Sequence, residues 1–190
     1  ENLRQPLEDG MITISRAKGS LHFPARFVLV AAMNPCPCGN ATDPEKICTC
    51  TPAQIMRYQQ KISGPIMDRI DLHVEVPRLS FDKLQQKGDE ERSFEIRARV
   101  ESAREIQKRR FEGLPIICNS EMSSDNIRKF CALDEKCKEL LRNAVSALKL
   151  SARGYHRIIK IARTIADLAK SESIDSAHIA EAIQYRFKSE

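Results

Sequence analysis

The sequence of 190 residues contains no tryptophan, and only 5% of its residues are aromatic. Most of the hydrophobic core must therefore come from Leu, Ile, Val and Ala, which a hydrophobic content of 42% allows. Long hydrophobic runs are also missing. The longest, residues 27–33, is far shorter than the about 20 residues that a membrane-spanning helix needs. A transmembrane helix is thus excluded, and the length fits one globular domain, alone or with a small satellite.

The chain also lacks a basic and apolar leader, which argues against secretion. It begins with Glu rather than Met, within what reads as the end of a helix, so we expect a piece of a longer protein. The net charge of +5 permits nucleic acid or a nucleotide as a partner without requiring either. We expect a cytoplasmic location and no membrane partner.

Cysteine is distributed unevenly, since four of the seven cysteines lie within a short stretch, residues 36–50. A secreted disulfide framework would spread an even number of cysteines across the chain, so this pattern favours a reducing compartment and a local metal site. Four thiolates this close in sequence can surround one Zn²⁺ tetrahedrally. We predict a structural zinc site formed by Cys36, Cys38, Cys48 and Cys50. Reduced or redox-active thiols are the alternative.

The first 77 residues predict part of an α/β unit. Two short β-like runs within residues 11–23 predict a hairpin with a basic tip that carries Arg16 and Lys18. The apolar run 26–34 is typical of a strand buried in the middle of a parallel sheet.

Further along, Thr51 and Pro52 predict the start of a helix. The alternating run 70–76 predicts a half-exposed strand at a sheet edge, which Pro77 ends.

After a polar stretch, the remaining chain predicts helices. A long charged helix is expected over 93–111, followed by helices over 121–130, 134–148, 151–171 and 175–187. Their expected N-caps are Asp134, Ser151 and Asp175. The 151–171 helix carries an apolar stripe formed by Tyr155, Ile158, Ile159, Ala162, Ile165, Ala166 and Ala169. Strands followed by a run of helices predict an α/β unit that carries a separate helical bundle.

Four polar or basic side chains could serve a nucleotide, and each has a structural alternative. Asn34 follows the predicted central strand, where open α/β sheets place ligands, but it could also form a turn before proline. Arg69 could reach a phosphate on a neighbouring subunit or join an exposed ion-pair network. Arg153 and Arg157 could bind phosphate at a helix N-terminus or form a solvated basic face.

Four segments together resemble one protein family: residues 3–10 (LRQPLEDG), 32–39 (AMNPCPCG), 64–71 (GPIMDRID) and 150–157 (LSARGYHR). Over essentially its whole length the chain resembles the C-terminal half of the magnesium-chelatase-like AAA+ ATPases of the ComM/YifB family. The resemblance implies a hexameric ring whose α/β nucleotide core is followed by a helical lid. It also implies ATP and Mg²⁺ as cofactors of the full-length protein, and ATP-driven branch migration of DNA during natural transformation.

The same resemblance assigns roles to individual residues. Asn34 becomes the sensor-1 residue and Arg69 the catalytic arginine finger. Arg153 becomes the sensor-2 arginine that binds ATP, with Arg157 as an alternate. The hairpin with Arg16 and Lys18 resembles a pre-sensor-1 hairpin that lines the ring's pore and contacts DNA.

The expected fold is therefore the C-terminal part of an AAA+ parallel-sheet core with a zinc-binding insertion, followed by an all-α lid. We expect a partial core over 1–77, a linker and long charged helix over 78–118, and the lid with sensor 2 over 119–190. Within the core we expect the pre-sensor hairpin at 11–23, the sensor-1 strand at 26–34, the cysteine cluster at 36–50 and the arginine-finger segment at 63–71.

One departure from the family is that the sequence has neither a G-x-x-x-x-G-K-[ST] loop nor a strand ending in an acidic pair. Because these elements cradle phosphates and hold Mg²⁺, we predict that the chain alone neither hydrolyses ATP nor binds it tightly. Two other functions remain open. One is the motor subunit of a magnesium chelatase, and the other is a zinc-stabilised binding module without motor activity.

Overall fold

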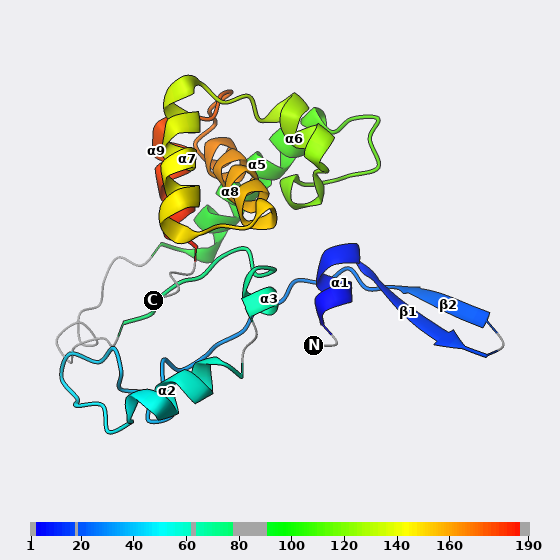
Figure 1. Ribbon diagram of the computed structural model, residues 1–190. Helices are drawn as coiled ribbons and strands as arrows, with labels where there is room; N and C mark the ends of the chain where they lie inside the picture. Colours follow the sequence, from blue (N-terminus) through cyan, green and yellow to red (C-terminus); the bar gives the residue numbers. More distant parts are fainter. Residues whose placement is uncertain (1–2, 18, 62–63, 78–90, 187–190) are drawn as a thin grey trace. The chain divides into compact units, whose positions relative to one another are not determined.

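Contacts within the chain divide it into two units, whose elements are drawn in Figure 1. Unit 1 comprises residues 1–70 and 75–79, and unit 2 comprises residues 71–74 and 80–190. The computed structural model describes residues 3–17, 19–61, 64–77 and 91–186.

Unit 1 begins with a helix and a hairpin. Helix α1 (Arg4–Asp9) ends at Gly10, which has the left-handed φ of 64° and donates its N–H to the carbonyl of Pro6. A side chain there would strain this backbone, so glycine suits the position. Strand β1 (Met11–Arg16) then pairs antiparallel with β2 (Gly19–Pro24), as Figure 1 shows. The predicted hairpin is confirmed.

The predicted strand over 26–34 is not formed. This segment forms no strand, and the side chains of Val28 and Val30 are each 89% exposed. A central strand needs hydrogen-bonding neighbours on both sides, and the sheet of the described residues holds only β1 and β2. The apolar side chains of residues 26–34 therefore stay exposed, because no neighbouring strand among the described residues pairs with this segment.

The predicted edge strand over 70–76 is not formed either, for the same reason. Val74 and Val76 are exposed, and the segment joins no ladder among the described residues. Instead, the backbone N–H of His73 donates to the carbonyl of Tyr185 within unit 2, at 2.9 Å.

Two helices follow the cysteine cluster in unit 1. Helix α2 (Pro52–Gln59) begins after Thr51, whose hydroxyl accepts from the backbone N–H of Gln54, while the Gln54 side chain accepts from the N–H of Thr51. This reciprocal pair satisfies two backbone donors and fixes the start of α2. The short helix α3 (Gly64–Met67) precedes the predicted arginine finger.

From residue 91 on, the described part of unit 2 is mainly helical, and its predicted N-caps are confirmed. Asp134, Ser151 and Asp175 each accept a hydrogen bond from the backbone of the turn that follows. The elements are α5 (Ser93–Arg110), the 3₁₀ turn η1 (Asn119–Glu121), α6 (Ser124–Phe130), α7 (Glu135–Leu148), α8 (Ala152–Leu168) and α9 (Ser176–Gln184).

The core of unit 2 is built around α8. Its buried apolar residues pack with Leu141 of α7 and Ile179 of α9. Four residues of the predicted stripe are buried, namely Ile158, Ile159, Ala162 and Ala166. Ala169 is exposed, contrary to the prediction, and lies just beyond the end of α8 at Leu168.

Helix α5 belongs to unit 2 rather than to a separate linker. Its C-terminal half packs there, with Ala103 and Gln107 buried, whereas Ile96 and Val100 are exposed. Among the residues that the structure describes, no helix is both long enough and apolar enough to span a bilayer.

Candidate metal centre and nucleotide-site residues

The four predicted metal ligands of unit 1 lie together. The Sγ atom of Cys36 is 3.4 Å from that of Cys38 and 3.7 Å from that of Cys48, and the Cys38 and Cys48 sulfurs are 3.5 Å apart. With Cys50 included, all four Sγ atoms lie within 4.8 Å of one another. Sulfurs around a tetrahedral Zn²⁺, with Zn–S bonds of about 2.3 Å, are about 3.8 Å apart. The side chains therefore fit one such ion.

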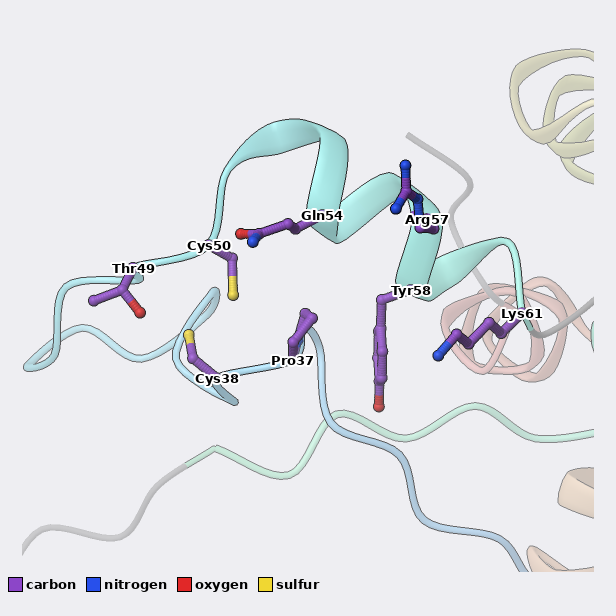
Figure 2. Close-up of a pocket in the computed structure, with 8 residues that line it drawn as sticks. All are labelled: Pro37, Cys38, Thr49, Cys50, Gln54, Arg57, Tyr58 and Lys61. Atoms are coloured by element: carbon purple, nitrogen blue, oxygen red, sulfur yellow. The ribbon is translucent and has the colours of Figure 1, made fainter.

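Local backbone structure brings the sulfurs together. Gly39, with a left-handed φ of 81°, closes a turn by donating its N–H to the Cys36 carbonyl at 3.0 Å. Cys50 lies directly before the capped start of α2, and Figure 2 shows the sulfurs of Cys38 and Cys50 pointing toward each other. Four thiolates would complete the tetrahedral coordination of one ion. The site would then be structural and have no open position for a substrate.

The thiols of this cluster differ in their readiness to lose a proton. Backbone N–H groups of Asn40 and Thr49 lower the pKa of Cys38 to about 5, with a further contribution from the Cys36 side chain. Burial raises the pKa of Cys50 to about 12. A metal ion that binds all four sulfurs must therefore displace protons from at least part of the cluster.

Asn34, the predicted sensor-1 residue, lies beside this turn. Its side chain is exposed, and its Nδ2 atom lies 3.8 Å from where a Cβ on Gly39 would stand. The structure therefore places Asn34 next to the cysteine loop rather than at the end of a formed strand.

Arg69, the predicted arginine finger, forms an ion pair inside unit 1. Its guanidinium donates to the carboxylate of Glu8 on α1, and the Arg69 side chain is only 12% exposed. The backbone N–H of Arg69 donates to the Ile66 carbonyl at 2.9 Å, which continues the turn of α3. Arg69 is therefore ion-paired, but with Glu8 and in a largely buried position rather than in the exposed network that was the alternative.

The predicted sensor-2 residues lie in the first turns of α8, in unit 2. Arg153 is exposed, whereas the guanidinium of Arg157 forms an ion pair with the carboxylate of Asp71. Lys160, one turn further along, donates to the carbonyl of Ser120 at 2.8 Å. Arg157 is therefore ion-paired with another segment of unit 2 rather than freely solvated, and Lys160 also contacts another segment of that unit.

The hairpin residues predicted to bind DNA lie at the end of β1 and beyond it. Arg16 is exposed and pairs in register with Gly19 of β2. Lys18 lies outside the described residues.

Sequence reasoning missed a buried polar network in unit 2. Asp167 is fully buried and accepts hydrogen bonds from the guanidinium of Arg110, from Nε of Arg163 at 3.1 Å and from Nδ2 of Asn119 at 2.8 Å. Arg163 also donates to the carbonyls of Ser171 and Glu172. The signal was present, because Arg163 and Asp167 are four residues apart and lie on the buried side of α8 among its apolar residues.

Comparison with protein families covers both halves of the chain. The family described as magnesium chelatase, subunit ChlI, matches residues 1–84, and the family described as magnesium chelatase, subunit ChlI C-terminal, matches residues 90–186.

Individual relatives match nearly the whole chain. It is 47% identical over 185 residues to competence protein ComM of Haemophilus influenzae and 40% identical over 187 residues to the uncharacterized protein YifB of Escherichia coli. It is also 39% identical over 186 residues to the uncharacterized protein Rv2897c of Mycobacterium tuberculosis. These alignments cover 97–98% of this chain but only 35–36% of each relative, so the chain spans about a third of their length.

Proposed function

The chain belongs to the family described as magnesium chelatase, subunit ChlI C-terminal, and from this premise we propose that it is part of a ring-forming ATPase of the ComM type. In this proposal the full-length ring is a hexamer that couples ATP hydrolysis to the remodelling of DNA. The observation that carries the proposal is the likeness to competence protein ComM along almost the entire chain.

In the proposed ring, each ATP lies between two subunits. Asn34 orients the attacking water, and Arg153 binds the phosphates from the first turn of α8, where backbone N–H groups favour anions. Arg69 reaches the ATP of the neighbouring subunit, where its guanidinium stabilises the charge that develops on the transferred phosphate. Mg²⁺ bound together with the ATP would neutralise part of the phosphate charge.

The Glu8 contact is consistent with this role for Arg69. A largely buried guanidinium needs an anion close by, and Glu8 supplies one within unit 1. A phosphate on the neighbouring subunit can take over as the counter-ion, so the arginine exchanges one anion for another. Such an exchange leaves no buried charge uncompensated.

We further propose that the cysteine cluster binds structural Zn²⁺. The sulfur separations support this assignment, because they match those of four thiolates around one ion. The ion would hold the loop that leads from Asn34 to the start of α2.

The DNA part of the proposal is tested in the full-length protein with the hairpin variants Arg16→Ala and Lys18→Ala. If the hairpin contacts phosphates, both variants lower the stimulation of ATP turnover by DNA while turnover without DNA is unchanged. The variant Lys46→Ala removes one exposed positive charge elsewhere in unit 1 and serves as the matched control. Full stimulation of both hairpin variants would count against a role for the hairpin in DNA contact.

The family description favours one second candidate, the motor subunit of a magnesium chelatase. That function predicts ATP-dependent insertion of Mg²⁺ into a porphyrin when partner subunits are supplied. The ComM-type function predicts no insertion, together with ATP turnover that responds to DNA. The two activities can be measured on the same preparation.

A further inference from the structure

A cleft lies within unit 1 between the cysteine loop and helix α2, and Figure 2 shows the residues around it. Its volume is about 700 Å³, within the about 300–1,000 Å³ that is common for ligand sites. The cysteine loop contributes one wall and α2 with the residues after it contributes the other. The lining residues are Pro37, Cys38, Thr49, Cys50, Gln54, Arg57, Tyr58 and Lys61.

The wall formed by α2 presents polar, basic and aromatic groups along one helix face. Gln54, Arg57 and Tyr58 follow the spacing i, i+3, i+4, which places side chains on the same side of a helix, and Lys61 lies in the turn that follows α2. On most helices this spacing marks the apolar face that packs against the core. Here the side chains line a cleft that is open to solvent instead.

The charge of the cleft suits an anion. Arg57 and Lys61 are exposed cations, and none of the eight described residues that line the cleft is acidic. Four thiolates around one Zn²⁺ would carry two negative charges of their own, so the cations could simply balance the cluster. Figure 2, however, shows Gln54 beside Cys50, whereas Arg57 lies further along α2 and Lys61 follows the end of the helix. The basic end of the cleft therefore extends away from the cluster.

The cleft also holds a surface for a flat ring. The ring of Tyr58 is half-buried and stands between Pro37 and Lys61 in Figure 2. Aromatic side chains flanked by cations are the combination that proteins use for single-stranded nucleic acid, because bases stack on the ring while phosphates meet the cations.

We propose that this cleft binds a single strand of nucleic acid, with one base stacked on Tyr58 opposite Pro37 and with Arg57 and Lys61 contacting the flanking phosphates. The cleft is a second nucleic-acid contact, separate in sequence from the hairpin that carries Arg16. The inference rests on the proposed function only for the choice of DNA as the strand.

The test measures binding of the zinc-loaded chain to a fluorescent oligodeoxythymidylate of about 12 nucleotides, by anisotropy at several salt concentrations. Tyr58→Leu is expected to weaken binding about fivefold or more without changing the salt dependence. Arg57→Gln and Lys61→Gln are each expected to reduce the slope of log K against log salt by about 0.7, because each removes one phosphate contact. Tyr58→Phe keeps the ring and is expected to bind like the unchanged chain.

Matched controls separate the cleft from the general surface. Lys46→Gln removes a positive charge from the cysteine loop outside the cleft, and Phe94→Leu removes an exposed ring from α5. Both are expected to leave affinity and salt slope unchanged. Zinc content and far-UV circular dichroism of each variant confirm that the fold and the metal are retained.

Several outcomes would overturn the inference. Unchanged binding by Tyr58→Leu would show that no base stacks on Tyr58. If Lys46→Gln lowered the slope of log K against log salt as much as the cleft variants do, binding would depend on general surface charge and not on the cleft. Loss of zinc without loss of DNA binding in Arg57→Gln and Lys61→Gln would assign these cations to charge balance. Preference for an acidic peptide over the oligonucleotide would make the cleft a protein-binding site.

The cleft and the proposed ATPase function can be tested separately. If the cleft variants bind DNA normally while Arg16→Ala lowers DNA-stimulated turnover, the cleft is excluded and the ATPase proposal survives. If the cleft variants lose binding and the full-length protein shows no DNA-dependent turnover, the cleft survives and the motor is excluded.

Discussion

Asp167 carries a negative charge into the fully buried interior of unit 2, where it faces the guanidinium groups of Arg110 and Arg163. Burial disfavours any unpaired charge, and it lowers the pKa of the Arg163 guanidinium even with its partner present. The network links α5, η1 and α8 through Asn119, which also donates to Asp167. The stability of this network therefore depends on the carboxylate of Asp167.

Asp167→Asn is expected to destabilise unit 2 by about 3–5 kcal/mol, because two buried guanidinium groups lose their shared anion. Urea unfolding followed by circular dichroism measures this loss. Asp125→Asn is the matched control, since Asp125 pairs with Arg128 on the surface, where both side chains are at least 80% exposed. If the two variants unfold at the same urea concentration, the network contributes no more than a surface pair.

The cysteine cluster makes a second prediction at the residue scale. Cys50 has a pKa raised to about 12 by burial, so at neutral pH and without metal it holds its proton. Zinc binding must release that proton, and apparent zinc affinity is therefore expected to rise at least about tenfold per pH unit between about pH 6 and 8. Chelator competition at several pH values measures the slope.

The control for this prediction is a thiol outside the cluster. Cys118→Ser is expected to retain one equivalent of zinc, whereas Cys38→Ser loses tight binding. A pH-independent affinity, or retention of zinc by Cys38→Ser, would contradict a four-thiolate site.

At the scale of elements, local signals predicted the helices of unit 2 well. Ser151 and Asp175 accept hydrogen bonds from the first turns of α8 and α9, as their sequence positions indicated. Each cap is decided within about four residues, so the sequence alone contains the information.

The strands expected over 26–34 and 70–76 fail for the opposite reason. Their apolar patterns describe a surface ready to be paired and buried, but pairing is decided by other strands, and the described residues supply none for them. In contrast, β1 and β2 are close in sequence and pair with each other. The same distinction holds for the candidate sites. The cysteine cluster is local in sequence and was predicted, whereas the contacts of Arg69 with Glu8 and of Arg157 with Asp71 join distant segments and were not.

The cap of α8 gives a prediction at this scale. Ser151→Ala is expected to destabilise unit 2 by about 1 kcal/mol, because the backbone N–H of Gly154 loses its acceptor. Thermal unfolding measures the change. Ser146→Ala, an exposed substitution inside α7, is expected to be neutral or slightly stabilising because alanine is the better helix former. An equally neutral Ser151→Ala would show that the cap does not hold the start of α8.

At the scale of the whole molecule, this chain supplies the predicted sensors and finger but no phosphate-binding loop in its own sequence. We therefore expect the chain alone to show no tight ATP binding in calorimetry and no ATP turnover, since the phosphate cradle and Mg²⁺ ligands provide most of the binding. Tight binding by the 190-residue chain would contradict this division of the site.

The proposal places Asn34 and Arg69 of one subunit in different ATP sites. Subunits of the full-length protein that carry Asn34→Ala or Arg69→Ala are therefore each expected to be inactive in uniform rings. Where an Asn34→Ala subunit donates its intact Arg69 to a subunit that retains Asn34, one complete site is rebuilt.

The most direct test is the ATP turnover of rings assembled from an equal mixture of Asn34→Ala and Arg69→Ala subunits. Random assembly is expected to restore about a quarter of the sites. An equal mixture of Arg69→Ala and Arg69→Gln subunits, which rebuilds no site, is the control and stays inactive. Turnover of the first mixture well above that of the control supports an arginine finger that acts between subunits, and turnover equal to that of the control contradicts it.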